Sequence, residues 1–168
     1  MTDNNVEQSI IKELSSNNAE TVKKTINKLT KKQELYLFPI IIELLNKNIG
    51  SELNQVFVSY LNNNKNTDTV DLFADAISNP NNVKILPLLI SACWQNGMDY
   101  TKHALLFIDT YINEAFVVAI EAFSVIEVMF DTLSENQKSE IITKLKYAIP
   151  EMPQEKKKFT KELLFMLE

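Results

Sequence analysis

The sequence predicts an all-α protein of about ten short antiparallel helices stacked in series as a single domain over residues 1–168. Three observations lead to this prediction. Apolar residues recur at every third or fourth position along most of the chain, no segment alternates convincingly between apolar and polar residues as a strand does, and only two glycines are present, Gly50 and Gly97. Because tight turns and phosphate loops normally need more glycine, this composition favours helices joined by short polar links.

Ten segments carry the apolar spacing that is typical of amphipathic helices. In chain order they are residues 6–14, 19–29, 33–47, 53–61, 70–77, 83–94, 104–111, 114–132, 141–149 and 159–167. The third segment is so rich in apolar residues that we expect neighbouring helices to cover most of its sides.

Helix-end signals separate several of these segments. Asn79 followed by Pro80 is typical of a cap with proline at the first helical position. Gly97 stands where a left-handed residue ends a helix, and Ser134 and Gln137 have the spacing of a capping box. These signals predict short links rather than long loops.

The segment 114–132 gives the clearest helical pattern. Its polar residues are Glu121, Ser124, Glu127 and Asp131, spaced 3, 3 and 4 residues apart, with apolar residues between them. Only a helix brings these four residues into one stripe while burying the rest. The acidic residues also indicate a buried helix rather than a membrane span.

A similarity between two segments of the chain, which we call the 48-residue echo, favours an α-solenoid over the alternative of an irregular helical bundle. Residues 37–42 and 85–90 are alike at a distance of 48 residues, and Gly50 and Gly97 follow them. Proline inside a helix costs about 3 kcal/mol. The matching Pro39 and Pro87 therefore suggest a repeated kink that suits the curved packing of stacked repeats.

Residues 38–45 and 86–94 resemble the first helices of HEAT or armadillo-type repeats, and residues 91–100 are similar to uncharacterised bacterial HEAT-repeat proteins. The resemblance covers roughly residues 33–132 and implies a right-handed α–α superhelix. Two features depart from the HEAT pattern. The chain lacks the arginine usual in the second helix, and the echo spans three helices, which fits a three-helix armadillo-like unit better.

Charge is distributed unevenly along the chain, whose net charge is −5. Residues 1–65 carry +1, residues 66–135 carry −8 and residues 136–168 carry +2. All 17 basic residues are lysine, so the bidentate phosphate and guanine contacts of arginine are missing. This balance disfavours nucleic acid as a partner and favours a basic protein segment on the acidic centre.

No motif for catalysis, cofactor or metal binding is present in the sequence, so we expect no enzyme activity and no cofactor. Cys93 and His103 are the single cysteine and histidine. We expect Cys93 in the core, His103 at a surface or helix end, and Lys156–Lys158 on the wet side of the last helix. A polar N-terminus without a signal-peptide layout and a lone cysteine predict a cytoplasmic protein.

The function predicted from these features is a non-catalytic protein-interaction module or scaffold that binds through the concave or rim face of a helical stack. The alternatives are a HEAT-like nucleic-acid-repair enzyme and a structural homo-oligomerising protein, and the oligomeric state is open. The candidate partner-binding residues are Asp71, Asp75, Trp94, Gln95, Asp99, Tyr100, His103, Asp109, Glu114, Glu121 and Glu127.

Overall fold

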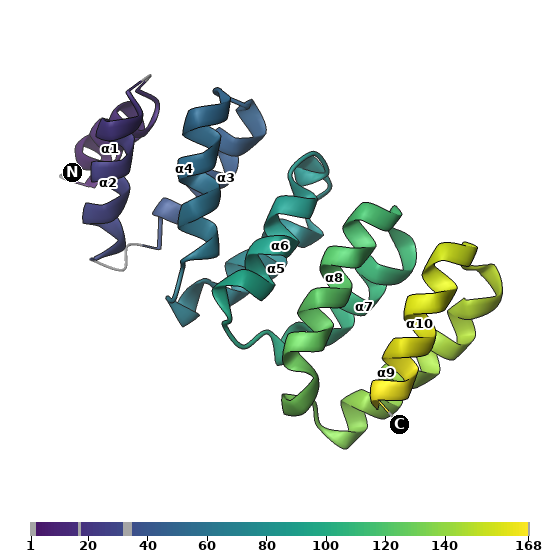
Figure 1. The fold of residues 1–168 in the computed structure, drawn as a ribbon. Coiled ribbons are helices and arrows are strands. Elements are labelled where there is room, and N and C mark those ends of the chain that lie inside the picture. Colours follow the sequence, from purple (N-terminus) through teal and green to yellow (C-terminus); the bar gives the residue numbers. More distant parts are fainter. Residues whose placement is uncertain (1–2, 17, 32–34, 168) are drawn as a thin grey trace. The chain divides into compact units, whose positions relative to one another are not determined.

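The computed structural model describes residues 3–16, 18–31 and 35–167, with side chains from residue 8 onward (Figure 1). Among these residues there are ten α-helices, five short 3-10 helices and no strand, so the all-α prediction is confirmed. The α-helices are α1 (Asp3–Leu14), α2 (Ala19–Thr30), α3 (Leu37–Lys47), α4 (Ser51–Asn62), α5 (Val70–Ser78), α6 (Leu86–Asn96), α7 (Ala104–Asn113), α8 (Phe116–Met129), α9 (Glu135–Ala148) and α10 (Gln154–Leu167). The 3-10 helices are η1 (Thr67–Thr69), η2 (Pro80–Asn82), η3 (Thr101–His103), η4 (Phe130–Thr132) and η5 (Ile149–Glu151).

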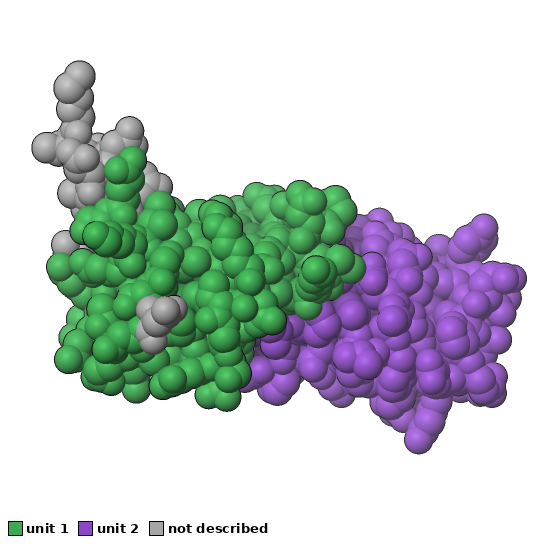
Figure 2. Space-filling model, turned by 90° about the horizontal axis from the view of Figure 1, so that it is seen from above, with its two compact units in different colours: residues 1–85 green, residues 86–168 purple. Residues whose placement is uncertain are grey.

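The chain forms two compact units, residues 1–85 and residues 86–168 (Figure 2). The N-terminal unit contains α1 to α5 and the C-terminal unit contains α6 to α10. Within the described residues, no helix has the length and apolar character needed to cross a membrane.

Helices two apart in the chain lie side by side within each unit. In the N-terminal unit α2 packs on α1 and α4, and α3 packs on α4 and α5. In the C-terminal unit α8 packs on α6, α7 and α10, while α9 packs on α7 and α10 (Figure 1). The 48-residue echo relates α3 to α6, which are three helices apart in the chain. The three-helix unit that it suggests therefore stays a prediction.

The two matching prolines start helices instead of kinking them. Pro39 is the third residue of α3 and Pro87 is the second residue of α6. The first four N–H groups of a helix have no intrahelical acceptor, so proline sacrifices no hydrogen bond there. The expected mid-helix kink is therefore wrong, and the sixth helix begins at Leu86 rather than at Val83.

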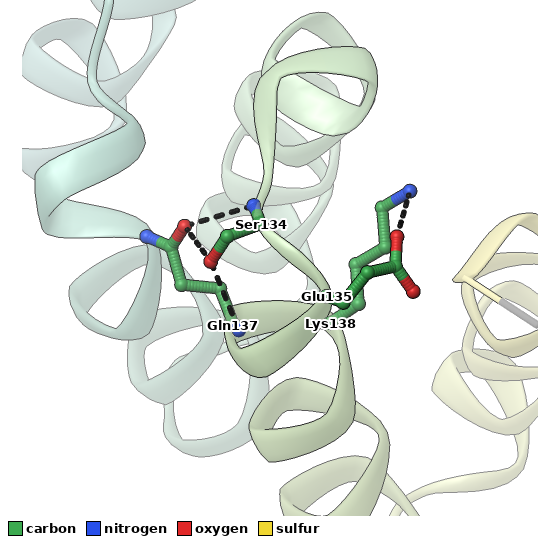
Figure 3. A network of polar contacts seen from close by, with 4 residues as sticks. All are labelled: Ser134, Glu135, Gln137 and Lys138. Atoms are coloured by element: carbon green, nitrogen blue, oxygen red, sulfur yellow. Dashed lines mark hydrogen bonds and ion pairs between the residues drawn. The ribbon is translucent and has the colours of Figure 1, made fainter.

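The predicted helix-end signals at Gly97, Asn79 and Ser134 are confirmed. Gly97 has a φ of 63° directly after α6, and Asn79 accepts a hydrogen bond from the Asn81 N–H at the start of η2. At the start of α9 the Ser134 Oγ accepts from the Gln137 N–H, and the Gln137 Oε1 accepts from the Ser134 N–H (Figure 3).

Two helix packings are joined by buried polar side chains. In the N-terminal unit the Asn82 Nδ2 donates to the Ala76 carbonyl over 2.8 Å, and its Oδ1 accepts from the Asn46 Nδ2 over 2.6 Å. These bonds tie the end of α5 to α3.

Lys156 makes the second of these polar contacts, between α10 and α7 in the C-terminal unit. Its side chain is 3% exposed, and its Nζ donates to the carbonyls of Tyr111, Ile112 and Glu114 at the end of α7. Burial lowers the pKa of this lysine. The expectation that Lys156 lies on the wet side of α10 is wrong, because its ammonium group satisfies carbonyls that α7 cannot satisfy itself.

Candidate binding surfaces

A groove of about 870 Å³ runs between α2 and α4 in the N-terminal unit. We call it the α2/α4 groove, and its lining residues are Asn18, Ala19, Glu20, Lys23, Ile26, Asn27, Thr30, Glu52, Gln55, Val56, Ser59, Tyr60 and Asn63. These positions repeat every three or four residues, so each helix contributes one face along its whole length. A twelve-residue helix extends about 18 Å, which sets the length of the groove.

The groove has an apolar floor and a polar rim. Ile26 is buried and Val56 and Tyr60 are partly buried, whereas Lys23, Asn27, Gln55 and the other rim positions are exposed. Burial raises the pKa of the Tyr60 phenol to about 12, so this group remains a hydrogen-bond donor at neutral pH.

Amide and hydroxyl groups dominate the rim. The Asn18 side chain caps α2 by accepting from the Thr21 N–H at 3.0 Å, and the Asn63 Nδ2 donates to the Ser59 carbonyl at 2.8 Å. The ion pair between Glu20 and Lys24 is long at 3.9 Å and exposed, so it contributes little to stability. Amides offer both a donor and an acceptor, which suits contact with the backbone or polar side chains of a partner.

None of the binding residues predicted from the sequence lines this groove. Its signal is present in the sequence as polar residues that recur at helical spacing in segments 19–30 and 51–63, but such residues are equally typical of an ordinary wet helix face. The open space between α2 and α4 in the structure favours a groove over an ordinary solvent-exposed helix face.

Asp71 and Asp75 are exposed on α5 of the N-terminal unit, while the other nine predicted residues belong to the C-terminal unit. Asp75 also lines a hollow of about 380 Å³ together with Phe38, Asn46 and Asn82.

Trp94 and Glu121 are brought together in the C-terminal unit. The Trp94 Nε1 donates to the Glu121 Oε2 over 2.8 Å and so links α6 to α8. The indole is 38% exposed and stands two residues before the end of α6. Next to it, the Gln95 Nε2 donates to the Ser91 Oγ on the same helix.

Tyr100 lies in the core instead of at the surface. Its side chain is 1% exposed, and its hydroxyl accepts from the Asn96 Nδ2 at 2.9 Å. In this position it supports the end of α6 and offers no surface to a partner. Cys93 is buried as predicted, and burial raises the pKa of its thiol to about 12, so the thiol stays protonated.

The remaining predicted residues are spread over several elements. The Asp99 carboxylate accepts from the Thr101 N–H and hydroxyl at the start of η3, and these bonds lower its pKa. His103 is the half-buried residue immediately before α7. Glu114 follows α7, where its carbonyl accepts from Lys156.

Asp109 is separated from the acids of α8. It pairs with Lys144, so it belongs to the contact between α7 and α9. Glu127 is largely exposed on α8, and the partial desolvation of its carboxyl together with the nearby Glu162 raises its pKa. The structure thus joins Trp94 and Glu121 between α6 and α8, whereas Glu127 lies near Glu162 of α10.

The polar stripe of α8 differs in one respect from its prediction. Glu121 and Ser124 are half-buried and Glu127 is exposed, but Val117 and Val128 are also 66% and 56% exposed. The helix therefore presents apolar and acidic groups together.

Comparison of the chain with protein-family models, curated proteins and solved structures found no match. Among the described residues, no three His, Cys, Asp or Glu side chains come together as a group that could hold a metal ion.

Proposed function

We propose that this chain is a non-catalytic protein-binding module whose helices form a right-handed α-solenoid of the HEAT or armadillo type. The packing of helices two apart, seen separately in each unit, supports this architecture. Helices α1, α3 and α5 begin at residues 3, 37 and 70, spacings of 34 and 33 residues. Such spacings are typical of two-helix repeats in general, although HEAT and armadillo units are longer, at about 40–47 residues.

The α2/α4 groove is the observation that carries the proposed function. Its length of about 18 Å accommodates about five residues of extended chain or about three turns of helix, given rises of about 3.3 and 1.5 Å per residue. Its floor of Ile26, Val56 and Tyr60 takes apolar side chains, and its amide-rich rim pairs with polar ones. Helix-in-groove and extended-peptide recognition both use this combination.

A charge-bearing obstruction in the groove tests the proposal. Gln55 and Ser59 are exposed one turn apart on α4, so Gln55→Arg with Ser59→Arg fills the groove without disturbing the core. The matched control is Ser139→Arg with Thr143→Arg, which places the same change at the same spacing on an exposed part of α9.

Tagged protein carrying each pair is compared with the wild type in affinity capture from the native cell. We expect a partner that is retained by the wild type and by the α9 control and lost from the groove variant. If every captured protein is retained equally by all three, the groove is not the binding site.

A further inference from the structure

The exposed side of α6 and α8 in the C-terminal unit combines apolar and acidic side chains. We call it the α6/α8 face, and its residues are Trp94, Val117, Glu121, Ser124 and Val128, with Glu127 at the edge that is nearest to Glu162 of α10. Val117 and Val128 are eleven residues apart, or about three turns, so they lie on one side of α8 at a distance of about 16 Å. Single exposed apolar residues are ordinary, but these two share a face with the half-exposed Trp94.

A small hollow adjoins this face where α6 and α8 end. Its volume is about 190 Å³, and Val128 forms part of its lining together with Gly97, Met98, Val125 and Met129. A cavity of about 150 Å³ holds a benzene molecule. The hollow is therefore large enough for one aliphatic side chain of a partner.

The charged residues on the α6/α8 face are acidic, which favours a basic partner. Helices α6 and α8 contain no basic residue, whereas Glu121 and Glu127 lie on α8 and Asp131 follows in η4. Asp99 lines the hollow itself. The bond from Trp94 holds the Glu121 carboxylate at the boundary between the two helices. Lysine and arginine are the electrostatic complement, and an indole face also attracts cations.

We propose that the α6/α8 face docks a basic amphipathic helix of a partner protein. One apolar side chain of that helix enters the hollow, its apolar stripe covers Val128 and Val117, and its flanking cations reach Glu121, Glu127 and Asp131. This surface is separate from the α2/α4 groove, so the proposal goes beyond the function proposed above.

A synthetic peptide serves as the probe. It has eighteen residues, with leucines on one helical face and lysines on the other. One control peptide has the same composition with the leucines spread around the helix, and a second has glutamate in place of lysine. Trp94 is the single tryptophan of the chain, so its emission reports on this face directly.

We expect the amphipathic lysine peptide to bind at least about tenfold more tightly than either control peptide, and to shift the Trp94 emission to shorter wavelength as the indole loses water. Equal binding of the three peptides would overturn the proposal. So would the absence of binding at about 1 mM peptide.

Two variants with matched controls locate the contact. Val128→Lys should weaken binding about tenfold or more, whereas Tyr147→Lys, at a fully exposed position of α9, should not. Glu127→Gln with Asp131→Asn should weaken binding about three- to tenfold, and Glu140→Gln with Glu151→Gln less than twofold. Helical circular dichroism confirms that each variant is folded.

Equal losses in the face variants and their controls would show non-specific binding and reject the proposal. The Gln55→Arg and Ser59→Arg pair should leave peptide binding unchanged. Failure of the α6/α8 proposal is thereby distinguished from failure of the α2/α4 groove.

Discussion

The pairs α2/α4 and α6/α8 are equivalent in chain order, since both consist of even-numbered helices two apart, but they leave very different spaces. The first pair is separated by a groove of about 870 Å³, whereas the second approaches closely and leaves a hollow of about 190 Å³. The two pairs also differ in their side chains. Helices α6 and α8 carry fully buried alanines such as Ala92 and Ala122, whereas the groove-facing positions of α2 and α4 carry mostly longer polar side chains that are exposed.

The largest expected difference between the two regions is in thiol reactivity. Cys93 lies in the closed pair with a thiol pKa of about 12, whereas a cysteine introduced by Ser59→Cys in the open groove should titrate near the ordinary value of about 8.5. At pH 8 the thiolate fractions differ by roughly a thousandfold or more. Labelling with a disulfide reagent, with Cys93→Ala in the Ser59→Cys background, measures both rates. Similar rates would mean that the α6/α8 contact opens readily.

Side-chain truncation should also separate the two regions. Leu89 is fully buried on α6, so Leu89→Ala should lower the free energy of unfolding by about 3 kcal/mol. Val56→Ala, at a partly exposed position of the groove, should cost less than about 1 kcal/mol. Urea unfolding followed by circular dichroism provides both values, and equal costs would contradict the difference in packing.

Removing a lysine charge gives a somewhat smaller contrast. Lys156→Met leaves buried carbonyls at the end of α7 without their donor and should cost about 2–3 kcal/mol. Lys23→Met, on the exposed rim of the groove, should change stability by less than about 0.5 kcal/mol. The same unfolding measurement applies, and a neutral Lys156→Met would show that water replaces the ammonium group.

The smallest effect concerns Glu127. Burial and the neighbouring Glu162 raise its pKa above 4.5, so Glu162→Gln should move the value partway back while burial keeps it raised. A raised folded-state pKa means that the stabilising contribution is complete below pH 4.5 and is lost as the pH rises through the folded-state value. Glu162→Gln should narrow the pH range between the unfolded-state and folded-state pKa values of Glu127. Side-chain carbon NMR titration measures the pKa of Glu127. An unchanged pKa would mean that the Glu162 carboxylate does not interact with that of Glu127.

The ten helices could be predicted from the sequence because apolar spacing depends only on local geometry. The predicted segments 19–29 and 104–111, for example, match α2 and α7 closely. The prolines were harder to interpret, since Pro39 and Pro87 are compatible with a kink until the helix start is known.

The position of Lys156 could have been predicted from spacing. Lys156, Thr160, Leu163 and Leu167 are separated by 4, 3 and 4 residues and form the buried stripe of α10. The expectation that Lys156 lies in water gives more weight to its charge and to its place in a run of three lysines than to its spacing from the apolar residues. The α2/α4 groove had no comparable signal, because its existence depends on the separation of two helices and not on either helix alone.

The packing of helices two apart has a consequence for how the chain folds. Within each unit every helix contacts partners that are close in sequence, as α7 does with α8 and α9. Folding that depends on such local contacts is fast, because little loop entropy is lost before contacts form. Within each unit, a helix can therefore pack on its neighbours in the chain as soon as they have formed.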